Sequence, residues 1–454
     1  MRHGQMSLRD IVPPRSKFFN TGKFGRLFPT LPPFLPDTER VREALMEVGK
    51  AGGTMDKGDD ANLDNFNLPS GATFLGQFID HDLTFDPTSS LERRVDPESI
   101  ENFRTPVFEL DSLYGSGAEA SPFLYEKGRP MSGKLLTDPG FPNDLPRNSQ
   151  DVALIGDPRN DENLIVSQLH AAFIQFHNAV IDAEGADLEE AQQQVRWHYQ
   201  WMVLHEFLPN LVGPEVVEDV LFRGRRFYHW ANEPFIPVEF SVAAYRFGHS
   251  QVRPAFKIND TFNNGAEVPI FGAPGSNDLS GDKRIGDDRA VDWRNFFSID
   301  GSTPQYSKRI DTTLSSPLFR LPFIPPNMPS NPSSLAQRNL LRHLTFSLPS
   351  GQAVALAMFL DPLGSDELSD LADLGVGMEH RTPLWFYILR EADKRTDGRT
   401  LGPVGGRIVA EVFIGMLEGD RMSFLRQAPM WKPNLGQRSG EFGMVDLLKF
   451  AGVV

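Results

Sequence analysis

Residues 163–185 read NLIVSQLHAAFIQFHNAVIDAEG, and they give the clearest indication of the fold class. Their apolar side chains recur at i, i+3, i+4 and i+7, the spacing of one buried helix face, and the pattern ends at Gly185. Residues 187–213 (DLEEAQQQVRWHYQWMVLHEFLPNLVG) repeat the pattern with acidic residues at their start. Two such helices in succession predict a mainly α protein.

The rest of the chain supports a single large helical domain with little β structure. Strand signals are few and short, near 226–230 and 269–271, and segments 256–310 and 320–333 are connectors rich in Asn, Asp, Gly and Pro. No internal repeat or low-complexity linker is visible. Further helices are predicted near 215–223, 238–251, 333–346, 350–359, 365–373, 383–394 and 406–418.

Residues 1–70 differ from the body because Pro and Gly interrupt them, with one short helical pattern, TERVREALMEV. We expect an arm wrapped on a body of residues 71–454, with a floppy leader as the alternative. The first thirty residues hold no apolar run of the signal-peptide kind, and the most apolar internal run, 353–360, is too short to cross a bilayer. A soluble protein without a transmembrane segment is expected, cytoplasmic or exported by a non-classical route.

Composition removes several classes of function. A net charge of −15 over 454 residues disfavours nucleic acid as a partner, because an acidic surface repels phosphates. The chain has no Cys, which excludes disulfides, iron–sulfur clusters, thiolate-ligated haem and a Cys nucleophile.

The segment GQFIDHD at residues 76–82 carries the first chemical pattern. On a helix, Gln77 and His81 lie at i and i+4 and share a face. An imidazole can move a proton there while an amide orients water or peroxide. Asp80 and Asp82 flank the histidine. The alternative is a structural histidine in a helix.

Three further segments each give weaker evidence of function when considered alone. GDPRNDE at 156–162 is a polar turn before a helix, with Asp161 and Glu162 placed for the helix N-terminus. In YRFGHS at 245–250, the Gly before His249 permits close approach of a flat ligand, although a core histidine is the simpler interpretation. In RNLLR at 338–342, Asn339 and Arg342 share a helical face, which could equally be a solvated stripe.

Together and in this order, GQFIDHD, RTPVFELDSLYG, GDPRNDE, RFGH and RNLLR resemble the animal-type haem peroxidases of the peroxidase–cyclooxygenase superfamily, particularly their bacterial members. The resemblance covers roughly residues 20 to 420. It implies a helical haem enzyme that reduces hydrogen peroxide and oxidises a small donor such as a halide, thiocyanate or a phenol. It leaves the oligomeric state open.

The resemblance also implies roles for the distal residues. His81 is similar to the base that moves a proton between the peroxide oxygens, and Arg159 to the guanidinium that stabilises charge on the leaving oxygen. Gln77 matches the amide that positions water or halide.

On the opposite side of the haem, His249 matches the iron ligand, Asn339 the group that orients the other ring nitrogen, and Arg342 the partner of a haem propionate. Asp80 and Glu162 match two carboxylates that mammalian members ester-link to haem b. A third link is not expected, because Asn163 stands where one subgroup has Met.

A calcium loop is a further implication of the resemblance. Calcium prefers six to eight oxygen ligands, and the expected ones are Asp82, Thr105, Val107 through its carbonyl, Glu109 and Asp111. Glu109 departs from the Asp that is commoner at its position. The alternative is a solvated acidic loop.

Two other functions stay open. A cyclooxygenase-like fatty-acid dioxygenase needs a Tyr three residues before the proximal histidine, where this chain has Arg246, with Tyr245 one residue earlier. One residue turns a helical side chain by about 100°, so Tyr245 is not expected to reach that place. A binding or adhesion module with idle or absent haem is the other alternative.

Seven further histidines are interpreted as structural. His170 and His177 lie seven residues apart, about 10.5 Å along a helix, which is too far to share one metal ion. The others in this class are His198, His205, His229, His343 and His380.

Overall fold

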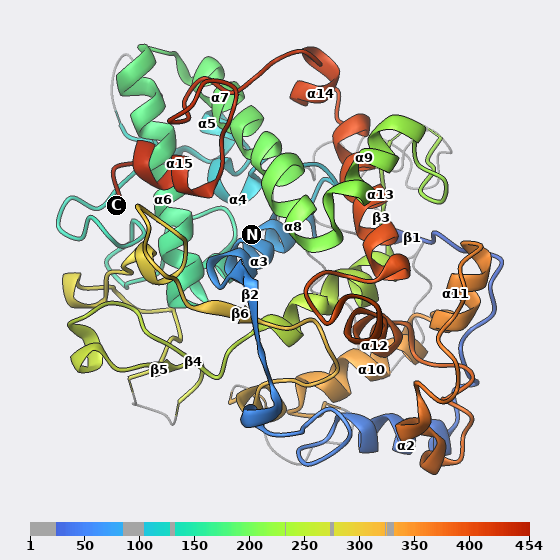
Figure 1. Cartoon of the computed structure of the whole chain (residues 1–454). Helices are drawn as coiled ribbons and strands as arrows, with labels where there is room; N and C mark the ends of the chain where they lie inside the picture. Colours follow the sequence, from blue (N-terminus) through green and yellow to red (C-terminus); the bar gives the residue numbers. More distant parts are fainter. Residues whose placement is uncertain are drawn as a thin grey trace.

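Helix α6 (Leu164–Glu184) runs through the interior of the computed structural model, which describes residues 24–84, 104–127, 132–231, 233–272, 277–322, 324 and 331–454 (Figure 1). The Asn163 side chain accepts a hydrogen bond from the backbone N–H of Ile165 (2.9 Å) and caps the helix start. Gly185 ends the helix with φ 63°, a conformation that favours glycine. The helix predicted from residues 163–185 is confirmed.

Helix α6 is also, among the described residues, the one helix long and apolar enough to span a membrane. However, 83% of its most apolar window is buried inside the protein. Burial of this extent is typical of a core helix, whose whole circumference packs against other elements.

The second predicted helix is present but interrupted. Helix α7 (Leu188–Met202) begins with a capping box, in which Asp187 and Glu190 exchange side-chain to backbone hydrogen bonds of 3.0 and 3.2 Å. The chain then widens into a π-helical turn at Val203–Phe207 and continues as α8 (Leu208–Val212). Pro209 has no N–H to maintain the regular α-helical ladder, which explains the interruption.

Most of the other predicted helices form. They are α2 (Glu39–Gly49), α3 (Gly71–Leu83), α9 (Pro214–Arg223), α10 (Leu335–Thr345), α11 (Gly351–Ala357), α12 (Leu384–Thr396) and α13 (Pro403–Gly419). The sequence patterns did not predict four short ones, α4 (Asp111–Tyr114), α5 (Gly117–Ala120), α14 (Phe424–Gln427) and α15 (Met444–Phe450). The helix predicted at 365–373 is a 3₁₀ turn at Ser369–Leu374.

The helix predicted at 238–251 is irregular throughout. A π-helical segment at Glu239–Ala243 changes directly into a 3₁₀ segment, η7 (Ala244–Gln251). Helix α3 packs against α6 and also against η7, and η7 packs in turn against α12 and α13. These contacts place α3 and η7 side by side in the middle of the molecule (Figure 1).

Strands are confined to three short pairs. β1 (Phe24–Gly25) is parallel to β3 (Ile236–Pro237), whereas β2 (Asp64–Pro69) with β6 (Tyr306–Lys308) and β4 (Ala255–Phe256) with β5 (Val268–Pro269) are antiparallel. The strand predicted near 269–271 corresponds to β5.

The strand predicted at 226–230 is wrong. The backbone N–H groups of Arg226, Phe227 and Tyr228 donate to the buried Glu411 carboxylate at 2.9, 2.7 and 3.0 Å. A carboxylate on α13 therefore satisfies the donors that a neighbouring strand would otherwise satisfy.

The described part of the N-terminal region packs on the body. Helix α2 lies against α10, where Ser334 Oγ donates to the Gly49 carbonyl (2.5 Å) and Gln337 Nε2 to the Met46 carbonyl (2.8 Å) (Figure 1). Residues 1–23 lie outside the described residues. The boundary at residue 70 between an arm and a body stays a prediction.

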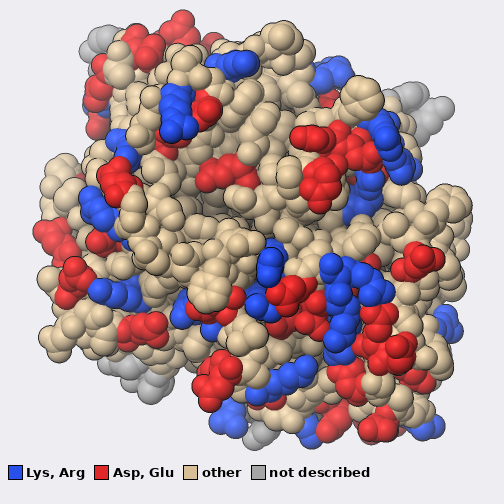
Figure 2. Space-filling view, viewed as in Figure 1, with Lys and Arg blue, Asp and Glu red and all other residues tan. Residues whose placement is uncertain are grey.

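Charges of both signs are interspersed on the surface. On the face drawn in Figure 2, the described Lys and Arg side chains alternate with Asp and Glu and do not gather into one extended basic surface. That face therefore offers no continuous positive track for a phosphate backbone.

Candidate functional site

Helix α3 presents a partly accessible stripe although most of the helix is buried. Gly76, Gln77 and Asp80 are half-buried, whereas Phe78, Ile79 and Asp82 are buried. The half-buried residues occupy positions i, i+1 and i+4 and so share one helix face. His81 adjoins this face with 6% of its surface exposed. The predicted shared face of Gln77 and His81 thus borders space that other side chains do not fill.

The His81 ring is held by an amide. Its Nδ1 lies 2.7 Å from Oδ1 of Asn160, which belongs to the turn η4 (Pro158–Asp161). Burial, together with the positive charge of Arg159, lowers the pKa of His81 to about 4. The imidazole is therefore neutral near pH 7, as a proton acceptor must be.

Arg159 lies against the same histidine. Its Nη2 donates to the His81 carbonyl (2.9 Å) and to Asp157 Oδ2 (2.7 Å), and its Nε donates to Asp157 Oδ1 (3.1 Å). Asp157 is fully buried and also binds the buried guanidinium of Arg104. Burial raises the pKa of Asp157, but Arg159 and Arg104 outweigh that effect and hold it well below its ordinary value.

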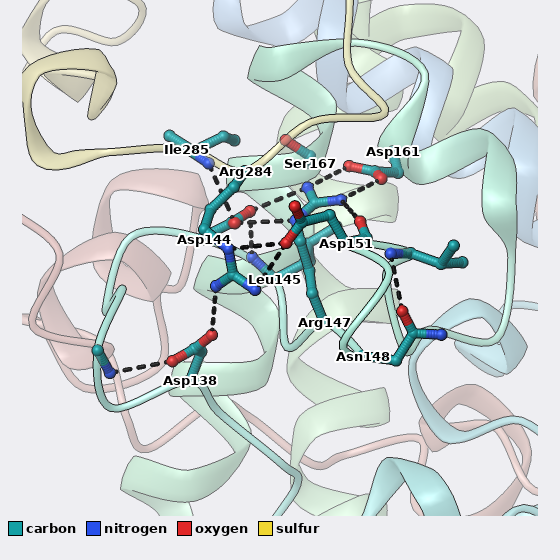
Figure 3. A network of polar contacts seen from close by, with 12 residues as sticks. Asp138, Asp144, Leu145, Arg147, Asn148, Asp151, Asp161, Ser167, Arg284 and Ile285 are labelled. Atoms are coloured by element: carbon teal, nitrogen blue, oxygen red, sulfur yellow. Dashed lines mark hydrogen bonds and ion pairs between the residues drawn. The ribbon is translucent and has the colours of Figure 1, made fainter.

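A second ion-pair network anchors the far end of η4 (Figure 3). The Arg147 guanidinium donates to Asp161 at 2.6 and 2.7 Å and to Asp144 at 2.8 and 3.0 Å, with all three side chains nearly fully buried. Asp161 was predicted to serve the N-terminus of the next helix. It binds Arg147 instead, and Asn163 caps that helix.

His249 lies in η7 beside open space. Its Nδ1 is 2.7 Å from Nδ2 of Asn339 on α10, and the role predicted for Asn339 stays a prediction. Burial and the charge of Arg246 lower the pKa of His249 to about 3. A Cβ atom built on the preceding Gly248 would meet no atom within 4 Å. The backbone at His249 is thus accessible to a flat ligand.

The two histidine elements are joined directly. Tyr245 Oη of η7 donates to the Gly76 carbonyl of α3 (3.1 Å), and Arg246 Nη1 lies 4.0 Å from Asp80 Oδ2. The negative charge of Asp80 partly offsets the fall in pKa of both His81 and His249. Both rings therefore lie within electrostatic reach of the same carboxylate.

The other residues predicted to bind haem lie at different depths. Asp80 is half-buried and accepts a hydrogen bond from Thr84 Oγ1 (3.2 Å), whereas Glu162 is exposed. Arg342 is half-buried on α10, one helical turn beyond Asn339. Their contacts with haem stay predictions.

Some of the residues predicted to bind calcium lie close to one another. Asp82 Oδ1 accepts from the backbone N–H of Asp111 (3.1 Å) and Oδ2 from Tyr199 Oη (3.3 Å). Burial and the Asp111 charge raise the pKa of Asp82 to about 7, and the same causes raise the pKa of Glu109 well above its ordinary value.

The backbone of the loop folds tightly, with Val107 N–H donating to the Thr105 carbonyl (2.8 Å) and Glu109 N–H to the Val107 carbonyl (3.2 Å). Within the described residues, however, no three His, Asp or Glu side chains converge as a metal-binding group. The calcium site stays a prediction.

Sequence reasoning missed three polar residues of this region: Asp157, Asn160 and His170. Asn160 Nδ2 lies 2.9 Å from His170 Nδ1, so His170 takes part in the network around His81. Asp157 and Asn160 belong to the GDPRNDE segment, but no spacing rule connects that turn with a helix 79 residues away. Other buried histidines bond to different groups, for example His177 to Tyr114 and to the Gly133 carbonyl.

Comparisons with known proteins show which family and which fold this chain resembles. An animal haem peroxidase family model matches residues 95–273. Thyroid peroxidase of Rattus norvegicus is 24% identical over 259 residues, which are 53% of this chain and 26% of that relative. The match thus spans about a quarter of the length of that relative.

Solved structures show the same fold. Peroxidase A from Dictyostelium discoideum has a TM-score of 0.66 and 16% identity, covering 94% of this chain and 93% of that chain. A fatty acid alpha-dioxygenase of Oryza sativa has a TM-score of 0.61 and 18% identity, covering 89% and 76%. The predicted mainly α fold is confirmed, whereas the affinity to bacterial members stays a prediction.

Proposed function

Because the chain belongs to the peroxidase–cyclooxygenase superfamily of animal-type haem peroxidases, we propose that it reduces hydrogen peroxide and oxidises a small donor at a haem between His81 and His249. One observation carries the proposal. Two neutral imidazoles, His81 buried and His249 half-buried, lie on adjoining elements, each held at Nδ1 by an asparagine, with open space at Gly248.

The residues around this space fit haem b. The open backbone at Gly248 and the half-buried stripe of α3 give a flat macrocycle room, and Arg342 is the cation proposed to pair with a propionate. Haem, when bound, supplies the two electrons that peroxide takes up and regains them from the donor. Asp80 and Glu162 are the carboxylates proposed for ester links.

The distal residues divide the proton chemistry between them. His81 Nε2 would take a proton from one peroxide oxygen and return it to the other, which would leave as water. Arg159 stabilises the negative charge that grows on that oxygen, and its salt bridges to Asp157 hold it in place beforehand. Gln77, on the same helix face, orients peroxide or water.

His249 is the proposed iron ligand through Nε2. That role requires the Nδ1 proton to face the carbonyl oxygen of Asn339, since a neutral imidazole carries one proton and Nε2 must be bare. A half-turn of the Asn339 amide, which now presents Nδ2 at 2.7 Å, gives this orientation. Iron binding and the amide orientation are therefore linked.

We also propose that Ca²⁺ binds at Asp82, Thr105, Val107, Glu109 and Asp111. The support is electrostatic. Asp82 is buried and Glu109 half-buried near Asp111, and desolvation together with the Asp111 charge raises the pKa values of both. A bound cation would relieve the repulsion between these carboxylates, and the closure of the side chains around it would accompany binding.

The fatty-acid dioxygenase is the second candidate, favoured by the fold shared with the Oryza sativa enzyme. Against it stands the position of Tyr245, whose hydroxyl donates to the Gly76 carbonyl and whose ring stacks on Phe240 with centroids 5.0 Å apart. Arg246 occupies the place where the oxygenases of the superfamily need a tyrosine. A binding module without haem chemistry is the third candidate.

A spectrum of the purified protein tests the proposal. We expect a Soret band that shifts on addition of hydrogen peroxide, together with peroxide-dependent oxidation of a phenolic dye. Oxygen uptake with a long-chain fatty acid and no peroxidase turnover would favour the dioxygenase. A protein that takes up no haem would favour the binding module. Acid–acetone extraction then reports the ester links, because only unlinked haem is extracted.

A further inference from the structure

The Asn160 amide lies between two buried histidine rings. Its Oδ1 is 2.7 Å from Nδ1 of His81, and its Nδ2 is 2.9 Å from Nδ1 of His170. Asn160 is fully buried, and His81 and His170 are 6% and 1% exposed. One buried amide therefore serves the Nδ1 atoms of both rings.

This arrangement dictates where both protons lie. An amide oxygen only accepts hydrogen bonds, and an amide nitrogen only donates them. His81 must then carry its proton on Nδ1, which leaves the lone pair on Nε2. His170 must accept on Nδ1 and so carries its proton on Nε2.

We propose that Asn160 is a positioning residue that holds His81 in the tautomer able to take the peroxide proton, and that His170 fixes the orientation of the Asn160 amide. The inference rests on the proposed peroxidase function and deepens it. In the opposite orientation the amide would donate to His81 Nδ1, and His81 Nε2 would carry a proton. Such a ring cannot accept one from peroxide.

The surroundings hold the amide rigidly. The backbone N–H of Asn160 donates to the Asp157 carbonyl (3.1 Å), and Arg147 binds the next residue, Asp161. His170 lies in the core helix α6, where the Phe78 ring packs edge-on against it with centroids 6.0 Å apart. Both ends of the hydrogen-bond chain are therefore fixed by packing and ion pairs.

The first test reads the tautomers directly. The protein as purified, with ¹⁵N-labelled histidine, is examined by long-range ¹H–¹⁵N NMR; if it carries haem, its diamagnetic ferrous carbon monoxide form is used. We expect His81 to be protonated on Nδ1 and His170 on Nε2. Spectra of His81→Gln and His170→Gln assign the signals. The reverse pair of tautomers overturns the proposal.

A matched set of variants tests the effect on the reaction. Asn160→Ala is expected to slow peroxide reduction about tenfold to a hundredfold, with an unchanged Soret band and a mixture of His81 tautomers. His170→Phe removes the acceptor that orients the amide and should slow the reaction several-fold. His170→Gln restores an acceptor and should return the rate to within about twofold of wild type.

The outcomes separate the two hypotheses. Equal rates in His170→Phe and His170→Gln with one unchanged His81 tautomer would contradict the role of His170, even if Asn160→Ala does not fold. A wild-type protein without haem or peroxide reduction would overturn the proposed function and the catalytic purpose of Asn160. The NMR result would still decide the tautomer assignment in that case.

Discussion

The two sides of the proposed haem site are built differently. On the His81 side, Arg159, Asp157 and Asn160 belong to one short turn that buried ion pairs hold at both ends. On the His249 side, the chain is an irregular 3₁₀ segment in which Asn339 holds the ring and Gly248 leaves open space. Proton transfer needs groups fixed in advance, whereas ligation needs one free nitrogen and room for the macrocycle.

The largest effect is expected on the less constrained side. His249→Ala removes the proposed iron ligand, so we expect the protein to lose its haem and with it all measurable peroxidase activity. Absorbance of the purified variant at the Soret band checks this. His380→Ala, whose wild-type side chain is 69% exposed, is the matched control and should bind haem normally. A full Soret band in His249→Ala would contradict the role of His249 as the iron ligand.

On the fixed side, replacing the base should affect the rate and not the binding of haem. His81→Ala is expected to slow peroxide reduction about 10²- to 10⁴-fold while the haem content stays unchanged. Stopped-flow absorbance after mixing with peroxide measures the rate. A normal rate in this variant would exclude His81 as the proton carrier.

The third prediction tests whether the ion pairs around η4 affect the rate of peroxide reduction. Asp157→Asn keeps the size of the side chain but removes the charge that holds Arg159 and the buried Arg104. We expect the rate to fall about tenfold and the free energy of unfolding to fall by about 3 kcal/mol, because a buried guanidinium loses a partner. Stopped-flow kinetics and urea unfolding provide the two numbers. A change in neither would show that the network is dispensable.

The smallest effect is expected for the hydrogen bond that joins η7 to α3. Tyr245→Phe removes the hydrogen bond to the Gly76 carbonyl and should cost about 1 kcal/mol of stability, with a peroxidase rate within about twofold of wild type. Thermal unfolding and dye oxidation measure both. Loss of fatty-acid oxygenation in this variant would instead identify Tyr245 as a radical site.

Sequence periodicity predicted one of these sides better than the other. The shared face of Gln77 and His81 follows from helical geometry alone, and so do the ends of α6. The regular helix predicted over 238–251 failed in detail, because a π-helical segment and a 3₁₀ segment follow one another there. Periodicity reports which residues are buried and does not report how the backbone hydrogen bonds are paired.

The residues missed by sequence reasoning share one property, which is that tertiary contacts define their roles. Asn160 and His170 look like a turn residue and a core histidine until the fold places one amide between two rings. In the same way, the three N–H groups of 226–228 look like a strand edge until Glu411 accepts from them. Such contacts join segments far apart along the chain, and no local pattern encodes them.

Arg104 has a consequence for how distant parts of the protein communicate. Its buried guanidinium binds Asp157 and lies 3.8 Å from Asp111, so two carboxylates compete for a single positive charge. A cation that neutralises Asp111 would strengthen the ion pair between Arg104 and Asp157. Asp157 in turn binds Arg159. Binding of the proposed Ca²⁺ near Asp111 would therefore shift the electrostatic field at the proposed peroxide side, with no backbone movement required.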